Sequence, residues 1–94
     1  KDLRSLPQIV KLRIDADQTP YVITKPLHSS QEIVKQEGDG SIEITLNVVI
    51  NLELEREILG FGHNIEVLSP RLLRHRIKKR LMLATRIYEK NTDV

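Results

Sequence analysis

The stretch that decides the fold is "SIEITLNVVI", residues 41–50. Apolar side chains occupy every second position from Ile42 to Ile50, and polar side chains alternate with them as far as Asn47. A two-residue period is typical of a β-strand, because successive side chains point to opposite faces of a sheet. We therefore predict a central strand that buries one face against the core.

The residues before this stretch predict two further strands. Asp39-Gly40 is a strong hairpin-turn signal, so the polar segment "SSQEIVKQ" (29–36) is expected to return as an edge strand. Farther upstream, "QIVKLRID" (8–15) alternates apolar and charged positions and predicts another strand. A short helix is expected between these strands, capped by Asp17 or Thr19, with Pro20 in its first turn and Pro26 at its end.

The residues after the central strand predict a helix, a short strand and a long helix. "NLELEREILGFG" (51–62) reads as a helix that Asn51 caps and that Gly60 or Gly62 ends. On this helix Glu53, Glu55 and Glu57 are expected to form a solvated face. "NIEVLS" (64–69) is a short strand, after which Ser69 is predicted to cap a helix with Pro70 at its first position, running to about Glu89.

The order strand, helix, strand, strand, helix, strand matches a ferredoxin-like fold, to which the last helix is appended. We expect a single α+β domain over residues 1–94, with a four-stranded antiparallel sheet, a core at about 8–69 and a C-terminal helix at about 70–89. A chain of 94 residues is long enough for one small domain. Because it begins at Lys1 and not at Met, we predict that it is a fragment of a longer protein.

Composition narrows the functional classes. The chain has no cysteine, which excludes disulfides, thiol catalysis and cysteine-ligated zinc and is compatible with a cytoplasmic location. No apolar run approaches the ~20 residues that a membrane helix needs, so no membrane partner is expected. Charge is unevenly distributed: residues 1–67 carry a net charge of −4, whereas residues 68–94 carry +6. The basic character therefore belongs to the C-terminal helix.

No catalytic or metal-binding pattern is found in the sequence. The three histidines, His28, His63 and His75, lack metal-ligand spacing and are expected at the surface or in turns. No acid–base pair, activated serine or phosphate loop is present, so we predict neither an enzyme nor a cofactor site. Aromatic residues are 3% of the chain, too few for a sheet surface that stacks RNA bases.

The last helix contains two arginines on its apolar side. At about 100° per residue, the side chains of Leu73, Ile77 and Leu81 share one arc with Ala84 and Tyr88. Arg80 falls inside this arc and Arg76 lies at its margin. The favoured interpretation is that their stems cover apolar surface while their charged ends reach water. The alternative is that they enter an interface and pair with acidic groups or phosphates, from this domain, a second copy or an effector.

Two segments carry a family resemblance. The first holds His28, Ser30 and Gln31; the second holds Gly60-Phe61-Gly62, Val67-Leu68-Ser69-Pro70 and Leu73-Arg74. Together they resemble the C-terminal extension (WCX) domain of WYL-domain bacterial transcriptional regulators, over roughly residues 9 to 89. The resemblance implies a ferredoxin-like fold and a regulatory role, with a helix-turn-helix and a WYL domain elsewhere in the parent protein.

From this resemblance we expect the domain to contribute to dimerisation and effector sensing. The expected partners are a second copy, the WYL and helix-turn-helix domains of the parent, DNA through the parent, and a nucleotide or nucleic-acid effector. Candidate effector or interface residues are Arg74, Arg76, Arg80, His28 and Gln31. His28 could instead fasten the turn after Pro26, and that role is favoured. Two alternatives stay open: a free-standing small-molecule sensor, and a nucleic-acid binder that uses the basic helix.

Overall fold

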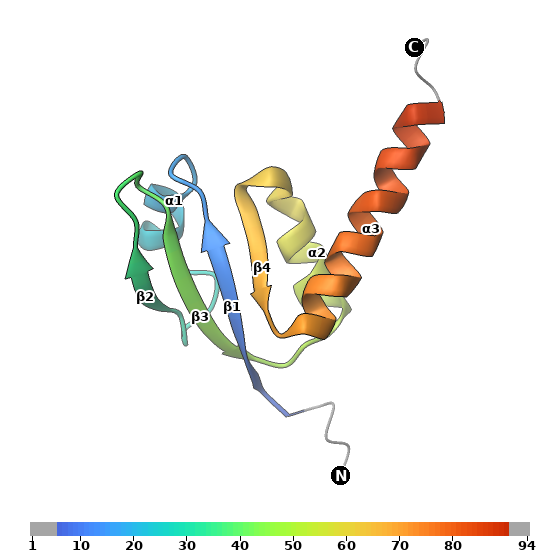
Figure 1. Ribbon diagram of the computed structural model, residues 1–94. Helices are drawn as coiled ribbons and strands as arrows, with labels where there is room; N and C mark the ends of the chain where they lie inside the picture. Colours follow the sequence, from blue (N-terminus) through green and yellow to red (C-terminus); the bar gives the residue numbers. More distant parts are fainter. Residues whose placement is uncertain (1–5, 91–94) are drawn as a thin grey trace.

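The computed structural model describes residues 6–90. In chain order the elements are β1 (Gln8–Ile14), α1 (Thr19–Thr24), β2 (Glu32–Gln36), β3 (Ile42–Val48), α2 (Leu52–Gly60), the 3₁₀ turn η2 (Gly62–Asn64), β4 (Ile65–Ser69) and α3 (Arg71–Lys90). Figure 1 shows α1 and α2 on the same side of a twisted sheet, with α3 extending away from the body.

The sheet has the strand order β2-β3-β1-β4, and every neighbouring pair is antiparallel. This order confirms the predicted ferredoxin-like α+β fold with an extra C-terminal helix. β2 is an edge strand, as predicted, and β4 is the other edge. The β2–β3 register shifts between Ile33 and Lys35, and the β1–β4 register shifts between Lys11 and Leu12.

The predicted alternation of β3 is confirmed by burial. Ile42, Ile44 and Leu46 are almost fully buried, whereas Glu43 and Thr45 lie on the opposite, partly exposed face. Equivalent positions of β1 and β4 join the same core, to which α1, α2 and α3 each contribute: Val10, Leu12, Ile14, Val67, Val22, Ile58, Leu73 and Ile77. The burial of these branched side chains supplies most of the driving force for folding.

The hairpin turn is the expected Asp39-Gly40. Gly40 has a φ of +94°, and a Cβ atom there would lie 3.1 Å from the Cβ of Ala16, so the position suits glycine in both conformation and space. The Asp39 carboxylate accepts hydrogen bonds from the hydroxyl of Ser41 at 2.6 Å and from its N–H at 2.9 Å. These bonds, the hydroxyl first, lower the pKa of Asp39 below its ordinary value.

The predicted N-terminal cap is correct for α2 and wrong for α1. Asn51 caps α2 as expected, because its side chain accepts from the N–H of Leu54 at 2.9 Å. The cap predicted for α1 is wrong: Thr19 is the first helical residue, and its hydroxyl donates to the carbonyl of Asp15. Asp17 makes no capping bond, since the carboxylate that accepts the N–H of Gln18 belongs to Asp15.

α3 also begins one residue later than predicted. Ser69 ends β4, and the helix starts at Arg71, so Pro70 precedes the helix and accepts the N–H of Arg74 through its carbonyl. Within the described residues the helix runs to Lys90 and so includes the predicted end at about Glu89. No helix within residues 6–90 is long and apolar enough to cross a bilayer.

The apolar arc of α3 is buried over its first two turns alone. Leu73 is 1% exposed and Ile77 7%, whereas Leu81 is 44% exposed and Tyr88 79%. The sequence predicts one continuous apolar stripe, and the structure covers its N-terminal half with α2 and β4. The C-terminal half extends beyond both elements, as Figure 1 shows.

Candidate functional site

Glu55 is the buried acid beneath α3. It is 1% exposed, so the prediction of a solvated face is wrong for this residue. The reason lies in the helical spacing: Glu55 and Ile58 are three residues apart and lie on one face of α2, and Ile58 belongs to the core. A carboxylate in such a place needs partners, because a buried charge without them destabilises the folded state by roughly several kcal/mol.

Those partners are the two arginines on the apolar side of α3. Arg76 Nη2 lies 2.7 Å from Glu55 Oε2, and Arg80 Nε donates to Glu55 Oε1 at 3.1 Å. Both carboxylate oxygens are therefore occupied, and α2 is tied to α3 by charge-assisted hydrogen bonds. The structure shows the acidic partner within the domain, and the half-exposed arginine side chains also agree with the favoured interpretation that their charged ends reach water.

The two guanidinium groups are not buried with their carboxylate. The side chains of Arg76 and Arg80 are 51% and 46% exposed, whereas that of Glu55 is 2% exposed. Two positive charges face one negative charge, so the cluster has an excess positive charge at the surface. About half of each arginine side chain therefore stays in contact with solvent.

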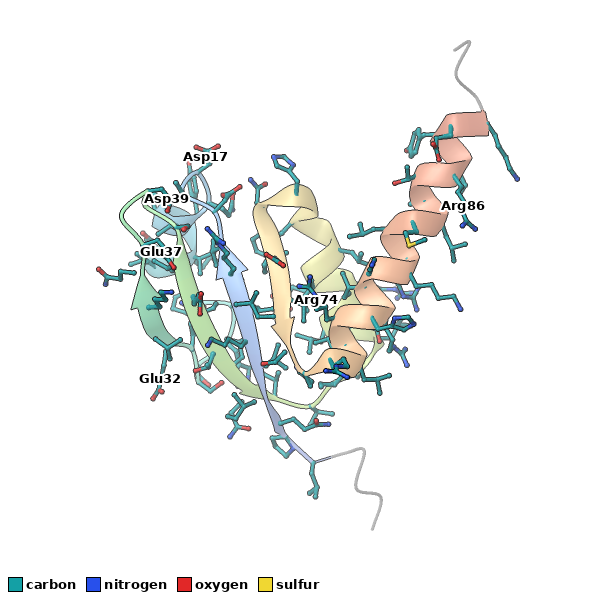
Figure 2. The ribbon with its side chains drawn as sticks, viewed as in Figure 1. Asp17, Glu32, Glu37, Asp39, Arg74 and Arg86 are labelled. Carbon is teal, nitrogen blue, oxygen red and sulfur yellow. The ribbon has the colours of Figure 1, made fainter. Side chains whose placement is uncertain are left out.

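Arg74 fastens α3 to the sheet. Its Nη1 donates to Glu66 Oε2 at 2.6 Å and to the carbonyl of Val67 at 2.8 Å. Both acceptors belong to β4, and Figure 2 shows Arg74 where α3 passes beside that strand. The Leu-Arg pair of the resembling segment thus contributes a core side chain, Leu73, and a polar clamp, Arg74.

His28 and Gln31 organise the loop between α1 and β2. The Gln31 side chain accepts from the N–H of Leu27 at 2.9 Å and donates to the carbonyl of Val22 at 3.1 Å. His28 Nδ1 accepts the N–H of Ser30 at 3.1 Å, and the Ser30 hydroxyl accepts the N–H of Asn47 at 2.8 Å. These bonds fasten the turn to α1 and β3, which is the role favoured for His28 from the sequence.

The Gly-Phe-Gly segment leads into a second polar link. Asn64, at the end of η2, donates from its side chain to Asp15 Oδ2 at 2.6 Å, and its carbonyl accepts the N–H of Asp15 at 3.0 Å. The hydrogen bond from Asn64, and after it that from the N–H of Gln18, lowers the pKa of Asp15. The link joins the end of β1 to the start of β4.

The candidate residues therefore form separate groups. Arg76 and Arg80 meet at Glu55, Arg74 lies at β4, and His28 and Gln31 lie in the α1–β2 loop; no ion pair or hydrogen bond joins these groups within residues 6–90. Glu55 is the residue that the sequence analysis missed. The sequence did contain a signal for this residue. On both α2 and α3, a charged side chain lies on the same side of the helix as the apolar residues that pack in the core.

Fold and polar clusters together define a class: a small ferredoxin-like α+β domain with a clamped and projecting C-terminal helix. In residues 6–90 no group of three or more acidic or histidine side chains is placed to hold a metal ion. A family model described as "WCX domain" matches residues 7–84. The chain belongs to the WCX domain family, whose members are regulatory C-terminal domains and not a known family of enzymes. No curated protein matches the chain significantly.

Proposed function

We propose that this chain is the regulatory C-terminal domain of a WYL-type transcriptional regulator and contributes to dimerisation and effector sensing. The observation that carries the proposal is the projecting half of α3. Leu73 and Ile77 form the buried part of the apolar stripe of α3, and the stripe continues in the exposed residues Leu81, Ala84 and Tyr88. An apolar helical face that extends past its own domain favours packing against another domain or another chain.

Charge distribution supports such an assembly. Figure 2 shows Asp17, Glu32, Glu37 and Asp39 on the β2 side of the molecule, and Arg74 and Arg86 along α3 on the other. Glu37 and Asp39 are already paired with Lys35 and Arg13, so the clearer signal is the positive charge of α3. That charge disfavours pairing two copies of α3 alone and favours contact between α3 and an acidic surface. The WYL and helix-turn-helix domains of the parent protein would supply the remaining interface and the DNA contact.

Effector sensing is assigned to the surface around Arg76 and Arg80. Glu55 fixes both guanidinium groups while leaving about half of each side chain exposed. An effector with phosphate or carboxylate groups would find preorganised donors and an excess positive charge there. Binding at the α2–α3 junction would change the direction in which α3 projects, and hence the relative placement of the subunits.

Light scattering on the 94-residue chain and on the full-length regulator tests the assembly role. We expect the full-length protein to be dimeric, and removal of residues 81–90 from it to weaken the dimer. If the full-length protein and the chain are both monomeric at working concentration, the assembly role fails.

Calorimetry with amino acids and with nucleotides tests the sensing role. We expect heat from the nucleotides alone, and its loss in an Arg76→Ala variant but not in a Lys79→Ala variant. An equal response in the two variants would exclude the arginine cluster as the effector surface.

A further inference from the structure

The outer edge of β4 has backbone groups that no other strand of the sheet bonds. The N–H of Asp15 donates to the carbonyl of Asn64, and the register continues through Ile14–Ile65, Arg13–Glu66 and Leu12–Val67. In an antiparallel pair the hydrogen-bonded residues alternate. Glu66 therefore points its N–H and C=O at β1, and so does the C=O of Asn64, whose N–H donates to the carbonyl of Phe61 instead. Ile65 and Val67 point their N–H and C=O groups away from the sheet. Among the described strands, β4 has no neighbour on that side.

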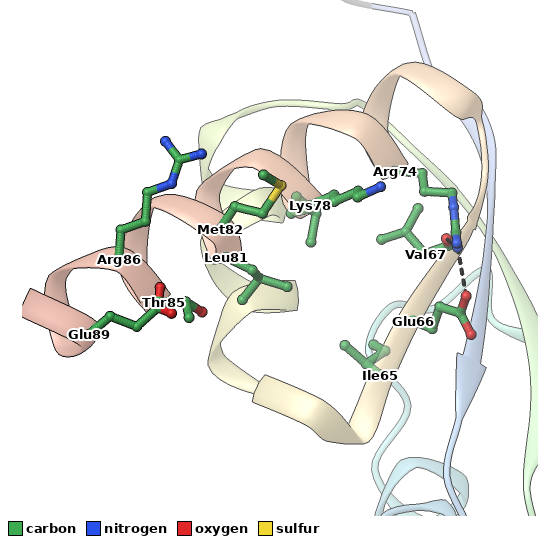
Figure 3. A pocket seen from close by; sticks show the side chains of 11 residues that line it. Ile65, Glu66, Val67, Arg74, Lys78, Leu81, Met82, Thr85, Arg86 and Glu89 are labelled. Carbon is green, nitrogen blue, oxygen red and sulfur yellow. Dashed lines mark hydrogen bonds and ion pairs between the residues drawn. The ribbon is translucent and has the colours of Figure 1, made fainter. Parts of the chain in front are cut away.

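A groove of about 430 Å³ runs between this edge and α3. It is lined by Ile65, Glu66 and Val67 of β4 and by Arg74, Ile77, Lys78, Leu81, Met82, Thr85, Arg86 and Glu89 of α3. Figure 3 shows Ile65 facing Leu81 across the groove, with Arg74 and Glu66 joined at one end. Its floor is therefore apolar, and one of its walls is a strand edge.

The charge of the lining is positive. Arg74, Lys78 and Arg86 come from α3, and of the two acids Glu66 is already paired with Arg74. Arg74 also donates to the carbonyl of Val67, the one outward-facing β4 carbonyl that is bonded among the described residues. Val67 is only 3% exposed, so the N–H and C=O of Ile65 are the outward backbone groups of β4 that are left to bind a partner.

We propose that this groove is a docking site for an extended acidic segment of another polypeptide, which adds to the sheet at Ile65. An extended segment can pair with the outward N–H and C=O of Ile65, and its alternate side chains then reach the apolar floor. Carboxylates on the remaining positions would pair with Lys78 and Arg86. The groove lies on the opposite side of α3 from Arg76 and Arg80, and it shares Leu81 with the stripe proposed for dimerisation, so self-association has to be followed beside peptide binding.

Charge decides between occupants of the groove. A second α3 would bring its own dense positive charge against Lys78 and Arg86, and a helix of any charge would leave Ile65 unpaired, because its backbone groups are bonded internally. An extended acidic segment can pair both with Lys78 and Arg86 and with the backbone N–H and C=O of Ile65.

The test uses the 94-residue chain and a blocked peptide that alternates valine with glutamate. NMR amide shifts and fluorescence anisotropy are followed as the peptide is added. We expect the largest amide shifts at Ile65 and Val67, and no binding of the same peptide with lysine in place of glutamate. N-methylation of the valines should abolish binding, since it removes the backbone donors that pair with β4.

Lys78→Glu and Lys79→Glu form a matched pair, because both residues are exposed neighbours on α3 and Lys78 alone of the two lines the groove. Lys78→Glu should weaken peptide binding about three- to tenfold, as expected for reversing one charge at the rim of an interface, and Lys79→Glu less than about twofold. Equal losses in the two variants, or shifts that avoid Ile65 and Val67, would overturn the proposal. So would a Lys78→Glu variant that loses self-association without any peptide, because the groove would then belong to a second copy.

Discussion

The two halves of α3 have the same amphipathic sequence pattern and opposite surroundings. Residues up to Arg80 are held by the core through Leu73 and Ile77 and by ion pairs to Glu55 and Glu66. Residues beyond it include Leu81, Met82 and Tyr88, which are exposed apolar side chains. A period in a sequence therefore identifies which face of a helix is apolar, but not what covers that face.

The largest difference between the halves should appear on truncating their apolar side chains. Leu73→Ala should lower the free energy of unfolding by about 3 kcal/mol, since it leaves a cavity in the core. Tyr88→Ala should change it by less than about 0.5 kcal/mol, as for other exposed positions. Urea denaturation followed by circular dichroism measures both. Comparable losses would mean that the second half packs on its own domain.

The ion pairs of the anchored half should give the next largest loss of stability. Removing Arg76 and Arg80 together should cost about 2 kcal/mol, because Glu55 then stays buried without a partner; the half-exposed guanidinium groups reduce the cost below that of a fully buried pair. Each single Ala variant should cost less than half of this, since the other arginine compensates.

Lys78→Ala combined with Lys79→Ala is the matched control, with an expected change within about 0.5 kcal/mol. A double-mutant cycle measured by urea denaturation separates the coupling between the two arginines from their individual effects. Equal small losses in the arginine and lysine pairs would show that the arginines merely cover apolar surface.

The projecting half should matter for association and not for folding. Tyr88→Glu should weaken the proposed dimer of the full-length regulator about fivefold or more, as truncation of a buried interface tyrosine does, while leaving the unfolding curve of the domain unchanged. His75→Glu, an exposed change on the polar side of the same helix, is the control. Sedimentation equilibrium measures the effect, and an unchanged dimer would place the interface elsewhere.

The smallest expected change in stability comes from the hydrogen-bonded link between β1 and β4. Because Asn64 and the N–H of Gln18 lower the folded-state pKa of Asp15, this carboxylate adds stability above its ordinary pKa of about 3.8, and the stability is lost as pH falls through the lower folded value. Asn64→Ala should therefore destabilise the domain at pH 7 and have less effect in acid below the folded pKa. A pH series of urea melts tests this, and a pH-independent loss would contradict it.

The strands were predictable because burial of one face imposes a two-residue period. Alternation at positions 42–50 led to the correct sheet, and Asp39-Gly40 to the correct hairpin. The α1 cap was wrong because the carboxylate that accepts the N–H of Gln18 comes from Asp15, just after β1, and not from either expected cap position. Such a bond depends on how the chain turns between elements, which local propensity does not determine.

The candidate site was half predictable. Arg76 and Arg80 were identified by their place on the apolar side of α3, but Glu55 was assigned to solvent because its neighbours Glu53 and Glu57 suggested a uniform acidic face. The two arginines and Glu55 are distant in sequence and meet only when α2 and α3 pack together. Each helix has a charge on its apolar side, but neither sequence segment alone indicates that these charges pair with each other. That pairing depends on how the two helices pack in the folded domain.

The register shift in β2 limits how this sheet can grow. An extra residue between Ile33 and Lys35 bends the strand, and Glu32, Lys35 and Glu37 add charge along or just beyond it. Bulges and charges of this kind discourage a second sheet from joining an edge. The opposite edge also has a register shift, at Leu68, and Arg74 bonds its Val67 carbonyl, so Ile65 is the part of that edge left open. The β2 edge of one copy is therefore unsuited to pair with the β4 edge of the next. A strand that adds at Ile65, as proposed above, would not start a fibre of stacked copies.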